Sequence, residues 1–159
     1  MSGVVHSVNV SSGGVPKYPV DSANVSEEGV EGDFNRFRVE DRGGDPDRAV
    51  CIFSIERIES LKEEGHPIEV GSTGENITIR GVEWNSLKVG TVLEIGGASL
   101  ELSEPCAPCS KIGRSFMVRR LARIDHQPEF GWSRWIARVL REGAVTVGGS
   151  VSVVIVVQG

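Results

Sequence analysis

The sequence predicts a mainly β fold, either a compact β-barrel or a strongly bent sheet, with one clear α-helix. Short apolar stretches rich in β-branched residues recur along the chain, and turn residues separate them at short intervals. One segment alone combines apolar residues at helical spacing with signals that end a helix. About eight short strands and one helix pack most economically as a closed or bent sheet. A chain of 159 residues can bury its own core, so we expect one domain over 1–159.

The first two strands are expected near the N-terminus. Residues 3–10 alternate between two faces, and residues 19–25 can form a second short strand after the Ser- and Gly-rich loop 11–17. The segment 29–48 that follows is dense in Gly, Asp and Arg. It is either a connection of two turns with exposed ion pairs or a loop that binds an anionic ligand. Glycine permits close backbone approach and arginine forms bidentate bonds with anionic oxygens.

A buried strand and the helix are expected next. Residues 49–53 form a short apolar run, and we interpret Cys51 within it as a small core residue. Ser54 is a typical N-cap, apolar residues follow at near-helical spacing, and Gly65 stops the pattern. The sequence therefore predicts a helix over 54–64.

The second half of the chain reads as further strands. An alternating strand follows a polar turn, and a hairpin then leads directly to two closely spaced cysteines. The expected strands of this half lie at 77–81, 91–102 (the hairpin), 132–140, 144–147 and 151–157.

Composition narrows the classes of partner and compartment. The formal net charge of -5 argues against a general nucleic-acid-binding protein, which needs a basic excess. The stretch 111–123 is nevertheless basic and contains no acid, so an anionic small molecule could bind there. No apolar run reaches the ~20 residues of a membrane span, and no secretory segment is visible. An odd count of three cysteines fits free thiols, so we expect a cytoplasmic protein.

Cys106 and Cys109 carry the most chemistry in the chain. Pro105 and Pro108 oppose a helix through the pair, which disfavours a thioredoxin-type redox site. A structural zinc site needs four ligands, and the chain offers few candidates to complete one. A single nucleophilic or metal-ligating thiolate, steadied by Lys111, needs no missing part. Two unreactive thiols on a turn remain the alternative.

Six short motifs occur in order along the chain, at 13–17, 32–33, 43–50, 74–79, 90–96 and 108–112. Together they resemble the MOSC domain, a family named for the C-terminal domain of molybdenum-cofactor sulfurase, and they extend the resemblance over about residues 3–155. The resemblance implies a compact, β-barrel-like fold, in agreement with the strand count.

The resemblance also implies a site. The family's signature cysteine falls on Cys109, in a Pro-Cys-x-Lys context, and in relatives this thiol carries sulfur or ligates the molybdenum of a pterin cofactor. A soft thiolate suits molybdenum, and arginines suit the phosphate of the cofactor. The implied catalytic residues are Cys109 and Lys111, and the implied cofactor-binding residues are Asp33, Arg42, Arg48, Glu75, Asn76 and Arg114.

Two positions depart from the family pattern. Many members have a histidine where this chain has Arg42, which leaves histidine-dependent chemistry without its residue. Standalone members often lack a cysteine at the position of Cys106, which makes Cys106 a candidate resolving thiol.

The resemblance leaves more than one function open. It implies a sulfur carrier or a molybdenum-cofactor-binding domain that works with a cysteine desulfurase or a molybdoenzyme, and no pyridoxal phosphate site is expected in this chain. The alternatives are a molybdenum-dependent reductase of N-hydroxylated compounds, which some longer members are, and a noncatalytic β-domain for protein contacts.

Overall fold

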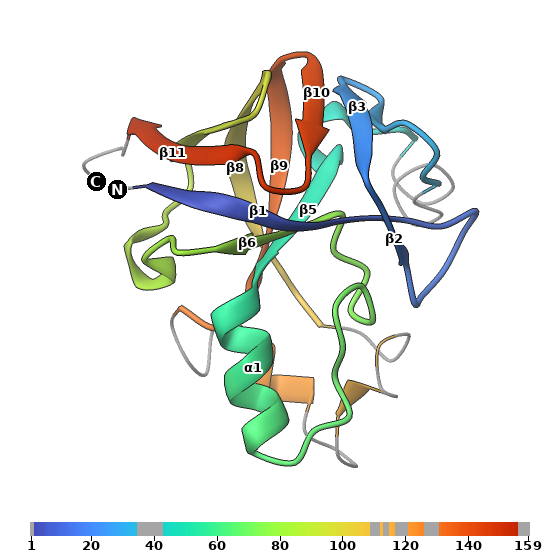
Figure 1. Cartoon of the computed structure of the whole chain (residues 1–159), viewed down its shortest axis with the longest axis vertical. Coiled ribbons are helices and arrows are strands. Elements are labelled where there is room, and N and C mark those ends of the chain that lie inside the picture. Colours follow the sequence, from blue (N-terminus) through green and yellow to red (C-terminus); the bar gives the residue numbers. More distant parts are fainter. Residues whose placement is uncertain are drawn as a thin grey trace.

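Seven strands close into a β-barrel in the computed structural model, which describes residues 2–34, 43–108, 112, 115–116, 121–125 and 131–155. The strands of the main sheet are β1 (Ser2–Val10), β2 (Tyr18–Val20), β5 (Val50–Ser54), β6 (Ile77–Arg80), β7 (Val92–Ile95), β8 (Ala98–Cys106), β9 (Arg134–Arg141) and β11 (Ser150–Ile155). Their order is β11-β7-β8-β9-β5-β6-β1, and an antiparallel pairing of β1 with β11 closes the ring. Strand β2 pairs with the last three residues of β1, Val8–Val10 (Figure 1). The predicted mainly β barrel is confirmed.

A smaller antiparallel sheet joins β10 (Gly143–Thr146), β3 (Ser22–Ser26) and β4 (Gly29–Val30). The single strand expected over 19–25 is therefore wrong in its extent. The chain divides between β2 and β3 because β2 pairs with β1 of the barrel, whereas β3 pairs with β10. The 29–48 segment likewise contains β4 and the 3-10 helix η2 (Pro46–Arg48), which composition alone did not indicate.

The expected helix is present as α1 (Ile55–Glu63) and directly follows β5. The hydroxyl of Ser54 accepts a hydrogen bond from the backbone N–H of Arg57, as an N-cap residue does. The apolar residues of the helix, Ile55, Ile58 and Leu61, are all buried. Strands β5 and β6 run parallel, and a parallel pair needs a crossover connection. Helix α1 lies in this connection and covers one end of the barrel (Figure 1).

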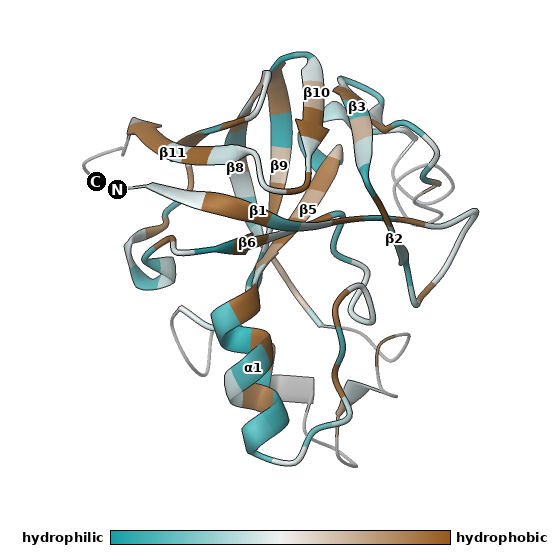
Figure 2. Cartoon of the chain, viewed as in Figure 1, coloured by the Kyte–Doolittle hydropathy of each residue, from teal (hydrophilic) through white to brown (hydrophobic). Residues whose placement is uncertain are grey.

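The barrel interior holds the core. Apolar side chains from β5, β6, β7 and β8 are buried in one cluster with those of α1. Brown segments are visible in Figure 2 on parts of β1, β5, β11 and α1. Two further 3-10 helices complete the described elements, η3 (Trp84–Ser86) and η5 (Leu121–Ile124). Among the described residues, the search for a helix long and apolar enough to cross a membrane finds none.

Candidate functional site

The strand β8 ends in the thiol Cys106, opposite the first residue of β9, Arg134. Strand β9 is also paired with β5, and β5 leads into α1, so Cys106 lies at the barrel end that carries the helix. The adjoining Ala107 is exposed and Cys106 itself is half-buried.

Arg134 is a buried cation that holds this strand end in place. It is only 5% exposed, its Nη1 donates to the carbonyl oxygen of Thr73 at 2.5 Å, and its Nη2 donates to the carbonyl oxygen of Ala107 at 3.2 Å. The guanidinium thereby joins the turn before β6 to the segment that leads toward Cys109.

The loop that contains η2 carries a second cation. Arg48 forms an ion pair with Glu104, which lies two residues before Cys106 on β8. The loop is fixed on the barrel from two sides, since the hydroxyl of Ser103 donates to the carbonyl oxygen of Asp47, and Nε of Arg138 pairs with Oδ1 of Asp47 at 2.9 Å. The predicted site residue Arg48 is thus brought next to the strand that carries the thiol.

Cys51 on β5 and Cys106 on β8 lie on the two strands that flank β9. Cys51 is buried, as predicted for a core residue, and its thiol interacts with the thiol of Cys106. The Cys51 thiol, aided by the charges of Arg134 and Arg48 and opposed by burial and Glu104, lowers the pKa of Cys106 to about 6. The Cys106 thiol and burial raise the pKa of Cys51. Cys106 is the thiolate of the pair because it is the less buried of the two and lies beside the arginines.

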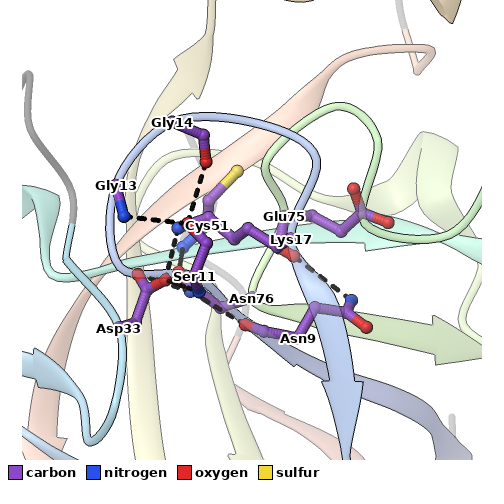
Figure 3. A network of polar contacts seen from close by, with 9 residues as sticks. All are labelled: Asn9, Ser11, Gly13, Gly14, Lys17, Asp33, Cys51, Glu75 and Asn76. Atoms are coloured by element: carbon purple, nitrogen blue, oxygen red, sulfur yellow. Dashed lines mark hydrogen bonds and ion pairs between the residues drawn. The ribbon is translucent and has the colours of Figure 1, made fainter.

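A polar network near Cys51 centres on Asp33 (Figure 3). Oδ1 of Asp33 pairs with Nζ of Lys17 at 2.6 Å and accepts from the backbone N–H of Ser11 at 2.9 Å. Oδ2 of Asp33 accepts from Nδ2 of Asn76 at 2.9 Å. The side chains of Lys17 and Asp33 are each only 6% exposed. This buried ion pair is hydrogen-bonded well enough to offset part of its desolvation cost.

Asn76 connects the ion pair to the thiol strand. Its Oδ1 accepts from the backbone N–H of Cys51 at 3.1 Å, and its own N–H donates to the carbonyl oxygen of Cys51 at 2.7 Å. Two predicted site residues, Asp33 and Asn76, are therefore in direct contact, and both brace the strand whose thiol meets Cys106.

Glu75 is oriented differently. Its carboxylate is fully buried, points away from Asp33 (Figure 3), and accepts from the N–H of Gly71 at 2.9 Å and from the hydroxyls of Thr73 at 2.7 Å and Thr78 at 3.1 Å. The hydrogen bonds of this carboxylate are all with residues of the turn over 71–78. A direct contact of Glu75 with a cofactor stays a prediction.

Four predicted site residues, Cys109, Lys111, Arg42 and Arg114, lie outside the described residues, so their roles stay predictions. Sequence reasoning missed Lys17, Cys51 and Arg134 as members of the site. Lys17 ends the motif 13–17, so this motif could have identified it as a site residue. The apolar run around Cys51 and the single arginine at the start of a strand give no indication of a site. Among the described residues, no group of three or more His, Cys, Asp or Glu side chains is arranged to hold a metal ion.

Fold and site together define a small β-barrel domain with a thiolate at the end of a strand. The MOSC domain family model matches residues 39–152, and the chain belongs to this family, as its sequence motifs predicted.

Two curated relatives and one solved structure extend the comparison. YflK of Bacillus subtilis (strain 168) is 31% identical over 139 residues, which are 86% of this chain and 61% of YflK. YiiM of Escherichia coli (strain K12) is 25% identical over 134 residues, 82% of this chain and 58% of YiiM. The crystal structure of YiiM from Geobacillus stearothermophilus superposes with a TM-score of 0.72 at 26% identity, covering 98% of this chain and 76% of that one. The chain spans about three fifths of the length of these curated relatives.

Proposed function

We propose that this chain binds molybdenum cofactor and that Cys109 is the protein's thiolate ligand to the metal. The observation that carries the proposal is the charge at the end of β8, where Arg134 and Arg48 lie beside a thiolate three residues before Cys109. Two guanidiniums at this position favour an anionic ligand. Membership of the MOSC family, which is associated with this cofactor, supports the same choice.

The residues present suit such a cofactor chemically. A molybdenum atom held in a pterin cofactor has sulfur ligands from the cofactor itself, so one soft protein thiolate suffices to complete its attachment. The cationic groups expected to hold the cofactor's phosphate are Arg48 and, outside the described residues, Arg42 and Arg114. When bound, the cofactor supplies a metal centre that can exchange electrons and oxygen atoms with a substrate.

The chain's own residues would prepare and hold this site. The cation of Lys111, two residues beyond Cys109, favours the anionic form of the ligating thiol. Arg134 donates to the carbonyl oxygen of Ala107 and so fixes the end of the thiol strand. The Asp33–Lys17 ion pair and Asn76 hold the neighbouring strand rigid. These contacts favour a positioning role for Asp33 and Asn76.

Metal content tests the proposal. The full chain would be produced in a host that makes molybdenum cofactor, and molybdenum per protein would be measured by elemental analysis together with the fluorescence of the oxidised pterin. We expect metal in the unaltered chain and its loss in Cys109→Ser, with Cys106→Ser as the matched cysteine control that retains it. Molybdenum near zero in the unaltered chain would contradict the proposal and the reductase alternative alike.

Sulfur transfer is the second candidate function, with a cysteine desulfurase as donor and a molybdoenzyme as acceptor. It is favoured by the lowered pKa of Cys106, because a thiolate is the form that accepts sulfur. The family resemblance puts the persulfide on Cys109. In that case a sulfur adduct formed with a desulfurase and labelled cysteine disappears in Cys109→Ser, and an adduct that persists in that variant contradicts the assignment to Cys109.

A further inference from the structure

The half-buried thiol Cys106 has every feature of a sulfur acceptor within the described structure. It ends β8 next to the exposed Ala107 and is less buried than Cys51. Arg134 lies directly opposite it in the β8–β9 register, and Arg48 is tied to the same strand through Glu104. Both cations stabilise an anionic sulfur at this position.

Cys51 is badly placed to form a disulfide with Cys106. Cys51 pairs with Ile136 and Cys106 pairs with Arg134, so β9 lies between the two cysteines. Neighbouring strands are about 4.8 Å apart, which puts second neighbours at roughly 10 Å. A disulfide needs Cα atoms within about 7 Å. The strand arrangement therefore disfavours the discharge by Cys51 of a persulfide on Cys106.

We propose that Cys106 is the sulfur-accepting thiol of this site and that it takes the outer sulfur of a hydropersulfide, leaving Cys109 to the metal. The inference rests on the proposed function, because it divides the two cysteines of that site between sulfur and molybdenum. The donor class is a protein or low-molecular-weight hydropersulfide.

The reaction is a balanced exchange. The Cys106 thiolate attacks the outer sulfur of R–S–SH, a new S–S bond forms, and the S–S bond of the donor breaks. The products are Cys106–S–SH and the thiolate R–S⁻, which leaves with the electron pair. The Cys106 sulfur is oxidised to a persulfide and the inner sulfur of the donor is reduced to a thiolate, so no further oxidant or reductant is needed. Arg134 and Arg48 then face a persulfide, which remains anionic at neutral pH.

Intact mass after reaction with glutathione hydropersulfide tests the assignment in the full chain. We expect Cys109→Ser to gain the mass of one sulfur atom and the Cys106→Ser, Cys109→Ser double variant to gain none. Cys51→Ala in the Cys109→Ser background should still gain sulfur, because Cys51 is not the acceptor. Circular dichroism of each variant checks that it is folded.

Two results would overturn the inference, namely no adduct in folded Cys109→Ser, or an unchanged adduct in Cys106→Ser. The sulfur assay uses protein without molybdenum, so its outcome is independent of the metal measurement. Molybdenum that is absent from the unaltered chain would remove the proposed function while leaving sulfur uptake on Cys106 as it was found. Molybdenum that is present, together with sulfur found only on Cys109, would retain the proposed function and remove this inference.

Discussion

Asn76 donates a hydrogen bond from its Nδ2 to Oδ2 of Asp33 over 2.9 Å, and so joins the loop after β4 to the start of β6. The same carboxylate pairs with Lys17, and both partners of this ion pair are almost fully buried. Three segments distant in the sequence therefore meet on one carboxylate. Removal of the Asp33 carboxylate should therefore destabilise all three segments.

Asp33→Ala should lower the free energy of unfolding by about 3–5 kcal/mol, because it leaves the buried ammonium of Lys17 without its counter-charge. Urea denaturation measures the loss. The matched control is Glu69→Ala, which removes the exposed Lys62–Glu69 pair at 2.8 Å and should cost only about 0–1 kcal/mol. Replacing Lys17 by Met as well should restore part of the stability, and equal losses for Asp33→Ala and Glu69→Ala would contradict the prediction.

The charge around Cys106 predicts a shifted pH profile of thiol alkylation. In the Cys109→Ser background, the rate with iodoacetamide should rise as the pH increases through about 6, because Cys51, Arg134 and Arg48 stabilise the thiolate. Arg134→Gln should move the midpoint upward toward the ordinary thiol value of about 8.5, and Arg48→Gln should move it in the same direction.

Arg141→Gln is the control for this profile, since Arg141 is exposed at the far end of β9 and should leave the midpoint unchanged. A midpoint near the ordinary value in the Cys109→Ser parent would show that Cys106 is not a thiolate at neutral pH.

Glu75→Ala should destabilise the fold. Its carboxylate accepts hydrogen bonds from Gly71, Thr73 and Thr78 in a buried turn, and each donor left unsatisfied costs about 1–3 kcal/mol. Thermal unfolding followed by circular dichroism gives the loss, with the exposed Glu63→Ala on α1 as control. Full stability of Glu75→Ala combined with loss of bound molybdenum would instead assign Glu75 to the cofactor.

Local patterns in the sequence were sufficient for the barrel class and for α1. Alternation and β-branched runs mark the strands, and Ser54 and Gly65 mark the helix ends because caps act over a few residues. The division of 19–25 between two sheets could not be predicted, because it depends on partners more than a hundred residues away in β10.

The sequence predicted only part of the site. Ordered motifs identified Asp33 and Asn76, which are in contact, and Arg48, which lies beside the thiol strand. The approach of Cys51 and Cys106 follows only from the pairing of both β5 and β8 with β9, which neither residue's neighbours in the sequence encode.

Gly71 provides a last prediction, because it touches the chain at Lys17. Its φ is +82°, and a Cβ added there would lie 2.2 Å from the backbone oxygen of Lys17. Gly71→Ala should therefore push the Lys17 segment away and weaken the ion pair with Asp33, beyond the cost of about 1–2 kcal/mol for a left-handed alanine. Gly14→Ala is a matched control, since Gly14 has a φ of +79° with nothing within 4 Å of the added Cβ.

Urea denaturation should show Gly14→Ala losing only the left-handed cost and Gly71→Ala losing clearly more. The two glycines share a backbone conformation, so the difference between the variants isolates the collision with Lys17. If the two substitutions cost the same, the close approach of Gly71 to Lys17 does not support the buried ion pair, and the rigidity attributed to this side of the site loses its basis.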